Sequence, residues 1–236
     1  LKSHYNQNCT NDRAHIFLSG DYGNDDIKSI ENLSLAFKNK KNLPSKYQAT
    51  KTEKQTIQIK GRENQSSLKL ALPLFNRNHK NYPGIYFLNT ILGGYFGSRL
   101  MKNIREEKGY TYNIYSMLDT YKYDGSWIIS CELDNEYVND TLEQISCEFD
   151  KLKTEPLSNQ ELQMVKNYLL GNFMSTINGP FKAINPVKMQ TLLGLESTFY
   201  NQLSQEILAF ESDEIQSLAR EYLNIDNFWK VIVGKA

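Results

Sequence analysis

Apolar residues alternate with polar ones in some stretches of the chain and recur at helical spacing in others. The alternating stretches predict strands, each with one buried face, and they are 57–59, 68–74, 112–118 and 127–133. Because Asp124-Gly125 lies between the last two, these are expected to form a β-hairpin. Short apolar runs at 16–18 and 228–233 predict a first buried strand and a closing strand.

Helical spacing, with its start and stop signals, predicts the remaining elements. The helical stretches are 27–37, 85–92, a short one from Ser98 to Lys108, 138–152, 162–173, 187–195, one from Phe199 onwards, and 215–223. Asp25-Asp26 and Ser98 are expected to cap helices, and Ser158 with Glu161 forms a capping-box pattern. The lysine-rich segment 38–54 is interpreted as a solvated connection.

Strands that cluster before helices, without a regular βαβ repeat, predict an α+β fold. We expect two layers: an antiparallel or mixed β-sheet with helices packed on one face. The 236 residues are expected to form one domain over 1–236. Since the chain begins with Leu1 rather than methionine, it is interpreted as a fragment or processed product, without its N-terminal targeting region.

Composition excludes several classes of function. Lys plus Arg (27) balances Asp plus Glu (27), so no global field attracts nucleic acid or anionic lipid. No stretch approaches the ~20 apolar residues that cross a bilayer, and we expect a soluble protein of the cytoplasm or the periplasm.

Residues for metal or nucleophilic catalysis are not grouped. His4, His15 and His79 are isolated, and neither H-x-x-E-H nor C-x-x-C occurs, so this chain is expected to bind no metal. The cysteines Cys9, Cys131 and Cys147 are far apart, and Cys131 is interpreted as a small buried hydrophobe. Glu106-Glu107 is interpreted as a solvated pair, and 93–98 as a turn between helices rather than a phosphate loop.

Arg105 and Tyr112 are the residues with the most promising chemistry. Arg105 lies in the last turn of the short helix and Tyr112 at the start of the next strand, so the link through Gly109 can bring both to one edge. A charged fork and a protonated phenol suit binding of peptide carbonyls or of an oxyanion. The commoner situation is a helix C-terminal cation and a sheet aromatic, and from the residues alone both interpretations stay open.

Here the sequence resembles a known family. The motif consists of Y-P at 82–83, L-N-T-I-L-G-G-Y-F-G-S-R-L at 88–100 and I-R-E-E-K-G-Y-T-Y at 104–112. It is similar to the C-terminal half domain of the M16 zinc metallopeptidases, the group of pitrilysin, insulin-degrading enzyme and mitochondrial processing peptidase. Weaker likeness extends over nearly the whole chain, which implies an M16/LuxS-like metallohydrolase half domain from a longer two-half peptidase.

The resemblance also implies a function. Two halves of like fold would enclose a peptide, and an N-terminal half or partner subunit would carry H-x-x-E-H and the zinc. This half would supply Arg105 and Tyr112, which are seven residues apart as in the family, to bind the substrate and support the transition state. Tyr110 stands where the family more often has an apolar residue, so the two tyrosines compete for this role.

Two functions therefore stay open. The chain is either the substrate-binding, non-catalytic half of a zinc peptidase, inactive alone, or a catalytically inactive, partner-stabilising subunit of the same superfamily. In both cases a large apolar or mixed face is expected where the other half docks, which would favour self-association of the isolated chain.

Overall fold

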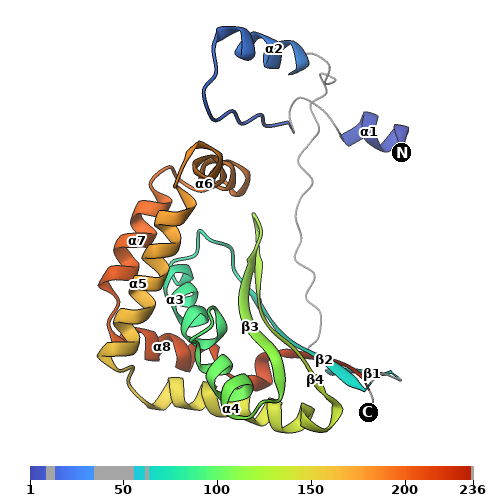
Figure 1. Ribbon diagram of the computed structural model, residues 1–236, viewed down its shortest axis with the longest axis vertical. Helices are drawn as coiled ribbons and strands as arrows, with labels where there is room; N and C mark the ends of the chain where they lie inside the picture. Colours follow the sequence, from blue (N-terminus) through green and yellow to red (C-terminus); the bar gives the residue numbers. More distant parts are fainter. Residues whose placement is uncertain (9–13, 35–55, 62–63, 235–236) are drawn as a thin grey trace.

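A five-stranded mixed sheet forms the centre of the computed structural model (Figure 1). The structure describes residues 1–8, 14–34, 56–61 and 64–234. In the order β1-β5-β2-β4-β3, the strands are Thr56–Lys60 (β1), Trp229–Gly234 (β5), Gln65–Leu74 (β2), Gly125–Asp134 (β4) and Thr111–Thr120 (β3). β1 runs parallel to β5, and the other neighbours are antiparallel.

Helices pack on one side of this sheet (Figure 1). They are Tyr82–Gly93 (α3), Val138–Thr154 (α4), Asn159–Thr176 (α5), Pro180–Leu193 (α6), Phe199–Ala209 (α7) and Ser212–Tyr222 (α8). A π-helix, η2 (Met101–Glu107), and two short 3₁₀ turns, η3 (Asn135–Tyr137) and η4 (Ile225–Asn227), complete this part. The predicted α+β fold, with a mixed sheet and helices on one face, is confirmed. No helix in the described ranges is long and apolar enough to cross a membrane.

The core lies between the sheet and the helices. Leu70 and Trp127 face it from the sheet, while Phe87 and Phe149 face it from α3 and α4, and all four are almost fully buried. Burial of each large apolar side chain contributes about 1.5–3 kcal/mol, so this layer holds α3 and α4 in place. α3 contacts β3, and the end of α3 is therefore fixed at the sheet edge.

The predicted hairpin is present as β3 and β4, but its first residues depart from simple alternation. The register shifts between Thr111 and Ile114, so an extra residue is accommodated in β3. Ile114 and Ser116 are buried, whereas Tyr112 is 88% exposed. A bulge bends its strand and redirects a side chain, which is why Tyr112 does not share the buried face expected from the period of two.

Two expectations about the first third of the chain are wrong. Residues 16–18 form no strand, and the side chains of Ile16 and Leu18 are 50% and 39% exposed. β1 is a strand as predicted, but all of its residues are exposed. Alternation of apolar and polar residues is a property of the segment itself, whereas burial of a strand also requires a neighbouring strand and a layer that covers it. The polar segment 38–54 and Cys9 lie outside the described residues.

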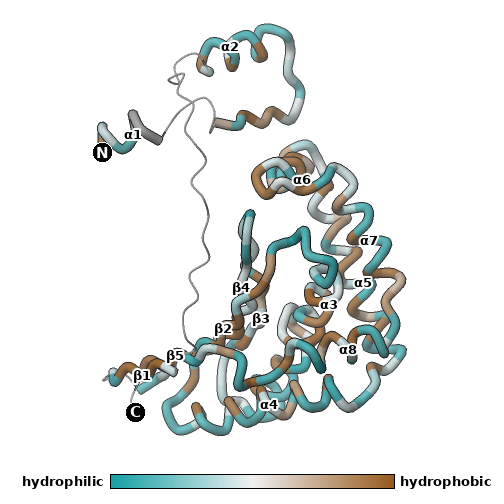
Figure 2. The backbone as a smooth tube through the Cα atoms, turned by 180° about the vertical axis from the view of Figure 1, so that it is seen from behind, coloured by the Kyte–Doolittle hydropathy of each residue, from teal (hydrophilic) through white to brown (hydrophobic). Residues whose placement is uncertain are grey.

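The N-terminal helices lie apart from the core. α1 (Lys2–Asn8) and α2 (Asn24–Ser34) are the described helices before the sheet, and α2 confirms the helix expected after Asp25-Asp26. No residue of α2 is buried, and both views place it beyond α6 (Figures 1 and 2). The Ser19 hydroxyl donates to the carbonyl oxygen of Pro180 at 2.5 Å, which joins this segment to the start of α6.

The face of the sheet opposite the helices is called the open sheet face. Register pairs place Met117, Ile128, Ala71 and Trp229 in one row across β3, β4, β2 and β5. The exposed apolar side chains of this face are Ile57, Ile59, Tyr115, Met117 and Val233. Figure 2 shows hydrophobic residues along β1 and β5 at one end of it. None of the described helices packs on this face, and the docking surface expected from the sequence stays a prediction.

Candidate functional site

The glycine-rich segment 93–98 is a tight turn that joins α3 to η2. A Cβ atom on Gly93 would lie 2.7 Å from the backbone nitrogen of Ser116 in β3, so only glycine allows this close approach. The amide of Gly94 donates to the carbonyl oxygen of Thr90 at 3.1 Å and ends α3. The turn therefore packs helix against strand, as the sequence interpretation of a helix-to-helix turn predicted.

The short helix predicted after this turn is present, and residues Met101–Glu107 of it are a π-helix. The amide of Lys108 donates to the carbonyl oxygen of Asn103 at 3.1 Å, and Gly109 then has a φ of +68° that ends the helix. The buried Asn103 amide donates to the Glu148 carboxylate at 2.8 Å and so joins η2 to α4. π-Helical turns are often found at functional sites, and here the helix carries Arg105 in its last turn.

The expected cap at Ser98 is wrong. The Oγ atom of Ser98 is buried and has no hydrogen-bond partner in the described part of the chain, although the Ser98 carbonyl oxygen accepts from the Lys102 amide at 3.0 Å. The capping pattern at Ser158 is confirmed only in its first half. Ser158 Oγ accepts from the Glu161 amide at 3.1 Å, but the Glu161 carboxylate binds elsewhere.

Arg105 is half-buried and lies beside two aromatic rings. Its guanidinium carbon is 4.7 Å from the ring centroid of Phe96 and 5.5 Å from that of Tyr112, both within cation–π range. No hydrogen bond or ion pair joins Arg105 to another described residue, and the adjacent Glu106 and Glu107 are exposed. Its N–H donors are therefore available to a ligand.

The structure separates the two tyrosines that competed for the site. The Tyr112 side chain lies beside Arg105, and no hydrogen bond joins its hydroxyl to the described part of the chain. Tyr110 instead stacks on Tyr137 of η3 at 4.2 Å. A hydrogen bond with Asp140 raises the pKa of Tyr110 and lowers the pKa of Asp140. The geometry therefore pairs Arg105 with Tyr112 and ties Tyr110 to α4.

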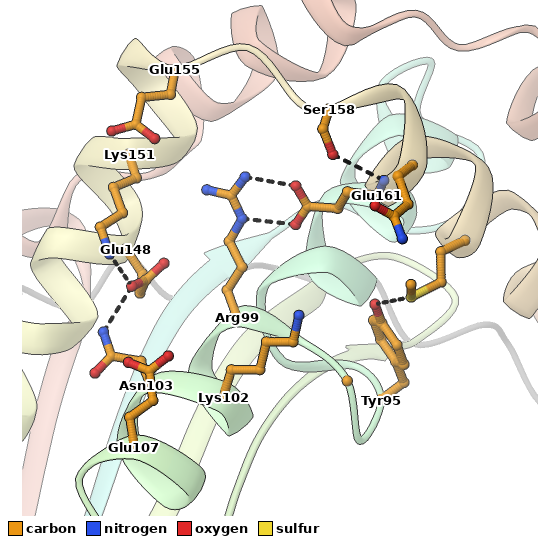
Figure 3. A pocket seen from close by; sticks show the side chains of 13 residues that line it. Tyr95, Arg99, Lys102, Asn103, Glu107, Glu148, Lys151, Glu155, Ser158 and Glu161 are labelled. Atoms are coloured by element: carbon orange, nitrogen blue, oxygen red, sulfur yellow. Dashed lines mark hydrogen bonds and ion pairs between the residues drawn. The ribbon is translucent and has the colours of Figure 1, made fainter.

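A charged cavity of about 420 Å³ lies between η2, α4 and the start of α5, and neither Arg105 nor Tyr112 is among its lining residues (Figure 3). On one wall, Arg99 makes a two-pronged ion pair with Glu161, with both N···O distances at 2.9 Å. On the other, the buried Glu148 accepts from Asn103 and from Lys151 Nζ at 2.7 Å. Sequence reasoning missed these residues because their partners are 62 and 45 positions apart, and a single sequence carries no signal for such pairs.

The described residues offer no metal centre, and the buried Cys131 is not an activated thiol. Within these ranges no group of three or more His, Cys, Asp or Glu side chains is placed to hold an ion. Burial raises the pKa of the Cys131 thiol to about 12, so the thiolate is disfavoured at neutral pH. This confirms the interpretation of Cys131 as a buried small hydrophobe.

Comparisons with known proteins agree with the motif. Residues 1–169 match the family described as the peptidase M16 inactive domain. The chain is 25% identical over 232 residues to the uncharacterized zinc protease YmxG of Bacillus subtilis, covering 96% of this chain and 55% of that protein. It is also 22% identical to the uncharacterized zinc protease SCO5738 of Streptomyces coelicolor, covering 90% of this chain and 48% of that protein. The chain thus spans about half the length of these relatives.

Solved structures share the fold. A peptidase M16 inactive domain from Pseudomonas fluorescens superposes with a TM-score of 0.80 at 23% identity, covering 92% of this chain and 52% of that one. A protease from Helicobacter pylori gives a TM-score of 0.80 at 16% identity, covering 92% and 53%. At these identities the likeness establishes the architecture alone.

Proposed function

The chain belongs to the peptidase M16 inactive-domain family, and we propose that it is the substrate-binding, non-catalytic half of a zinc-dependent metalloendopeptidase that cleaves peptides in a closed two-half chamber. Two relatives are named zinc proteases and are about twice as long as this chain. The described residues have no ligand set that fits a zinc ion, so the proposal assigns H-x-x-E-H to the other half or to a partner subunit. Zinc bound there would supply an activated water.

The observation that carries the proposal is that the guanidinium of Arg105 and the adjacent hydroxyl of Tyr112 have no hydrogen-bond partner among the described residues. An arginine without a carboxylate partner keeps five N–H donors for a ligand. Contact with an aromatic ring engages the face of the guanidinium, so the donors in its plane stay available. Both side chains would therefore present hydrogen-bond donors at the same edge of the molecule.

Each residue receives its own role in the proposed reaction. The peptide adds as a strand to a sheet edge, and β3, which carries Tyr112, is an edge strand of the described sheet. Tyr112 donates a hydrogen bond to the oxyanion that forms at the attacked carbonyl, because a phenol stays protonated at neutral pH. Arg105 donates to a neighbouring substrate carbonyl and holds the peptide in place.

Steady-state kinetics on the natural protein that contains both halves tests these roles. Tyr112→Phe should lower kcat and kcat/KM together by about 10²–10³, since an oxyanion donor acts only in the transition state. Arg105→Ala should raise KM as well as lower kcat, because a donor to a substrate carbonyl also stabilises the ground state. Tyr110→Phe is the matched control and should stay within a few-fold of wild type.

Two results would contradict the proposal in different ways. If Tyr110→Phe abolishes hydrolysis while Tyr112→Phe leaves kcat nearly unchanged, the residue assignment is wrong. If neither the natural protein nor a subunit that copurifies with it carries H-x-x-E-H, and no peptide in a mixed library is hydrolysed, the chain is a structural, partner-stabilising subunit instead.

A further inference from the structure

Phe96 is an exposed aromatic residue for which the core provides no explanation. It lies in the turn between α3 and η2, and 63% of its surface is exposed. Its ring centroid is 4.7 Å from the Arg105 guanidinium carbon, closer than the ring of Tyr112 at 5.5 Å. The exposed ring therefore lies against the arginine assigned to the substrate.

The conformation of the turn is fixed by its neighbours. Tyr95 packs against Tyr168 of α5 at 4.9 Å, and its hydroxyl lies 3.5 Å from the Met164 sulfur. A Cβ on Gly97 would lie 2.8 Å from the Tyr95 ring, so glycine is needed at this position. With Tyr95 held against α5, the next side chain in the turn, Phe96, contacts the last turn of η2.

We propose that Phe96 is a positioning residue for Arg105. Its ring holds the guanidinium beside Tyr112 and away from the flanking carboxylates of Glu106 and Glu107, while the N–H donors stay free. The contact between Phe96 and Arg105 stands independently of the enzyme, whereas its consequence for catalysis rests on the proposed function.

The first test measures the contact directly in the 236-residue chain. Ring currents shift the NMR signal of an arginine Nε–Hε group that lies over an aromatic ring, so the Arg105 signal, identified by its loss in Arg105→Lys, should move in Phe96→Leu. Phe96→Tyr keeps an aromatic ring and should retain the wild-type position. Phe181→Leu is the matched control, because Phe181 is also exposed, at 81%, but lies on α6 and has no described contact with Arg105. An Arg105 signal that stays in place in Phe96→Leu would overturn the proposal.

The second test is a double-mutant cycle in the natural two-half protein. Phe96→Leu should raise KM by about 2- to 5-fold, the range expected for one exposed cation–π contact, and Phe96→Tyr should restore it. In the Arg105→Ala background Phe96→Leu should have no further effect, because Phe96 acts through Arg105. An equal effect in both backgrounds would mean that Phe96 contacts the substrate itself, and would overturn the positioning role. If the NMR signal shifts but no peptide is hydrolysed, the positioning role is supported and the proposed function fails.

Discussion

At the scale of single residues, burial of Tyr82 links the fold to alkaline pH. Tyr82 is 3% exposed at the start of α3, between the rings of Tyr86 and Phe199. Burial raises its pKa to about 12, although the charge of Arg77 acts in the opposite direction. In the unfolded chain a tyrosine has a pKa of about 10. The folded state therefore favours the neutral phenol. The contribution of Tyr82 to the stability of the fold is fully present below pH 10 and is lost as the pH rises from 10 towards 12.

We expect Tyr82→Phe to weaken this loss of stability. In the wild type the Tyr82 contribution to the free energy of unfolding should fall by up to about 1.4 kcal/mol per pH unit above pH 10. Urea unfolding at pH 8, 9, 10 and 11 should show a shallower slope in Tyr82→Phe than in the wild type. Tyr5→Phe, at a residue that is 58% exposed, is the control and should keep the wild-type slope. If the free energy of unfolding has the same pH dependence in all three proteins, folding does not raise the pKa of Tyr82.

The functional groups of the candidate site could be predicted from the sequence, but the side chains with which individual residues interact could not. Arg105 and Tyr112 were expected to meet at one edge, and they do lie together. Tyr110 and Tyr112 have the same parity along the strand, so alternation gives them one face. The bulge in β3 and the hydrogen bond of Tyr110 to Asp140 separate them. Glu161 was expected to complete a capping box, but Arg99 provides a stronger, charged partner from 62 positions away.

At the scale of elements, the contact between α3 and β3 fixes the end of α3 and therefore the positions of the turn and of η2 that follow it. Gly93→Ala would place a Cβ 2.7 Å from backbone and side-chain atoms of Ser116, and neither helix nor strand can move without disturbing the core. We expect a loss of about 1–3 kcal/mol in the free energy of unfolding, measured by urea denaturation. Gly171→Ala in α5 is the matched control: its Cβ meets nothing within 4 Å, so it should stabilise the chain by about 0.5–1 kcal/mol. Equal changes in both variants would contradict a close approach at Gly93.

Elements with strong local signals were predictable, and elements that depend on a partner were not. α3, α4 and the β3–β4 hairpin begin and end close to the expected glycines, proline and polar turn residues. The segment 16–18 has the composition of a strand but no ladder partner among the described residues. The π-helical form of η2 was equally hidden, because the buried Asn103–Glu148 hydrogen bond comes from tertiary contact.

At the scale of the whole molecule, the open sheet face is covered by none of the described helices. The row Met117, Ile128, Ala71 and Trp229 crosses four strands and joins the exposed Val233 and β1 residues at one end. The relatives are about twice as long as this chain, and we infer that the other half covers this face in the natural protein. The assignment of 1–236 to one domain stays a prediction.

In the isolated chain, this face should bind a second copy. Exposed apolar surface on a β-sheet lowers its free energy by self-association, so sedimentation equilibrium of the wild-type chain should show a monomer–dimer equilibrium at high micromolar concentrations.

Met117 is 41% exposed at the centre of β3, and Met117→Lys would place a charge in the interface, raising the dissociation constant at least about tenfold. Leu208→Lys is the control, because Leu208 is 53% exposed on α7, on the helical side of the sheet, and should leave the equilibrium unchanged. A strict monomer at high concentration, or the same change in both variants, would mean that the open sheet face is not an interface. Addition of the other half as a separate chain should then compete with dimer formation in the wild type and bind Met117→Lys more weakly, because one face serves both partners.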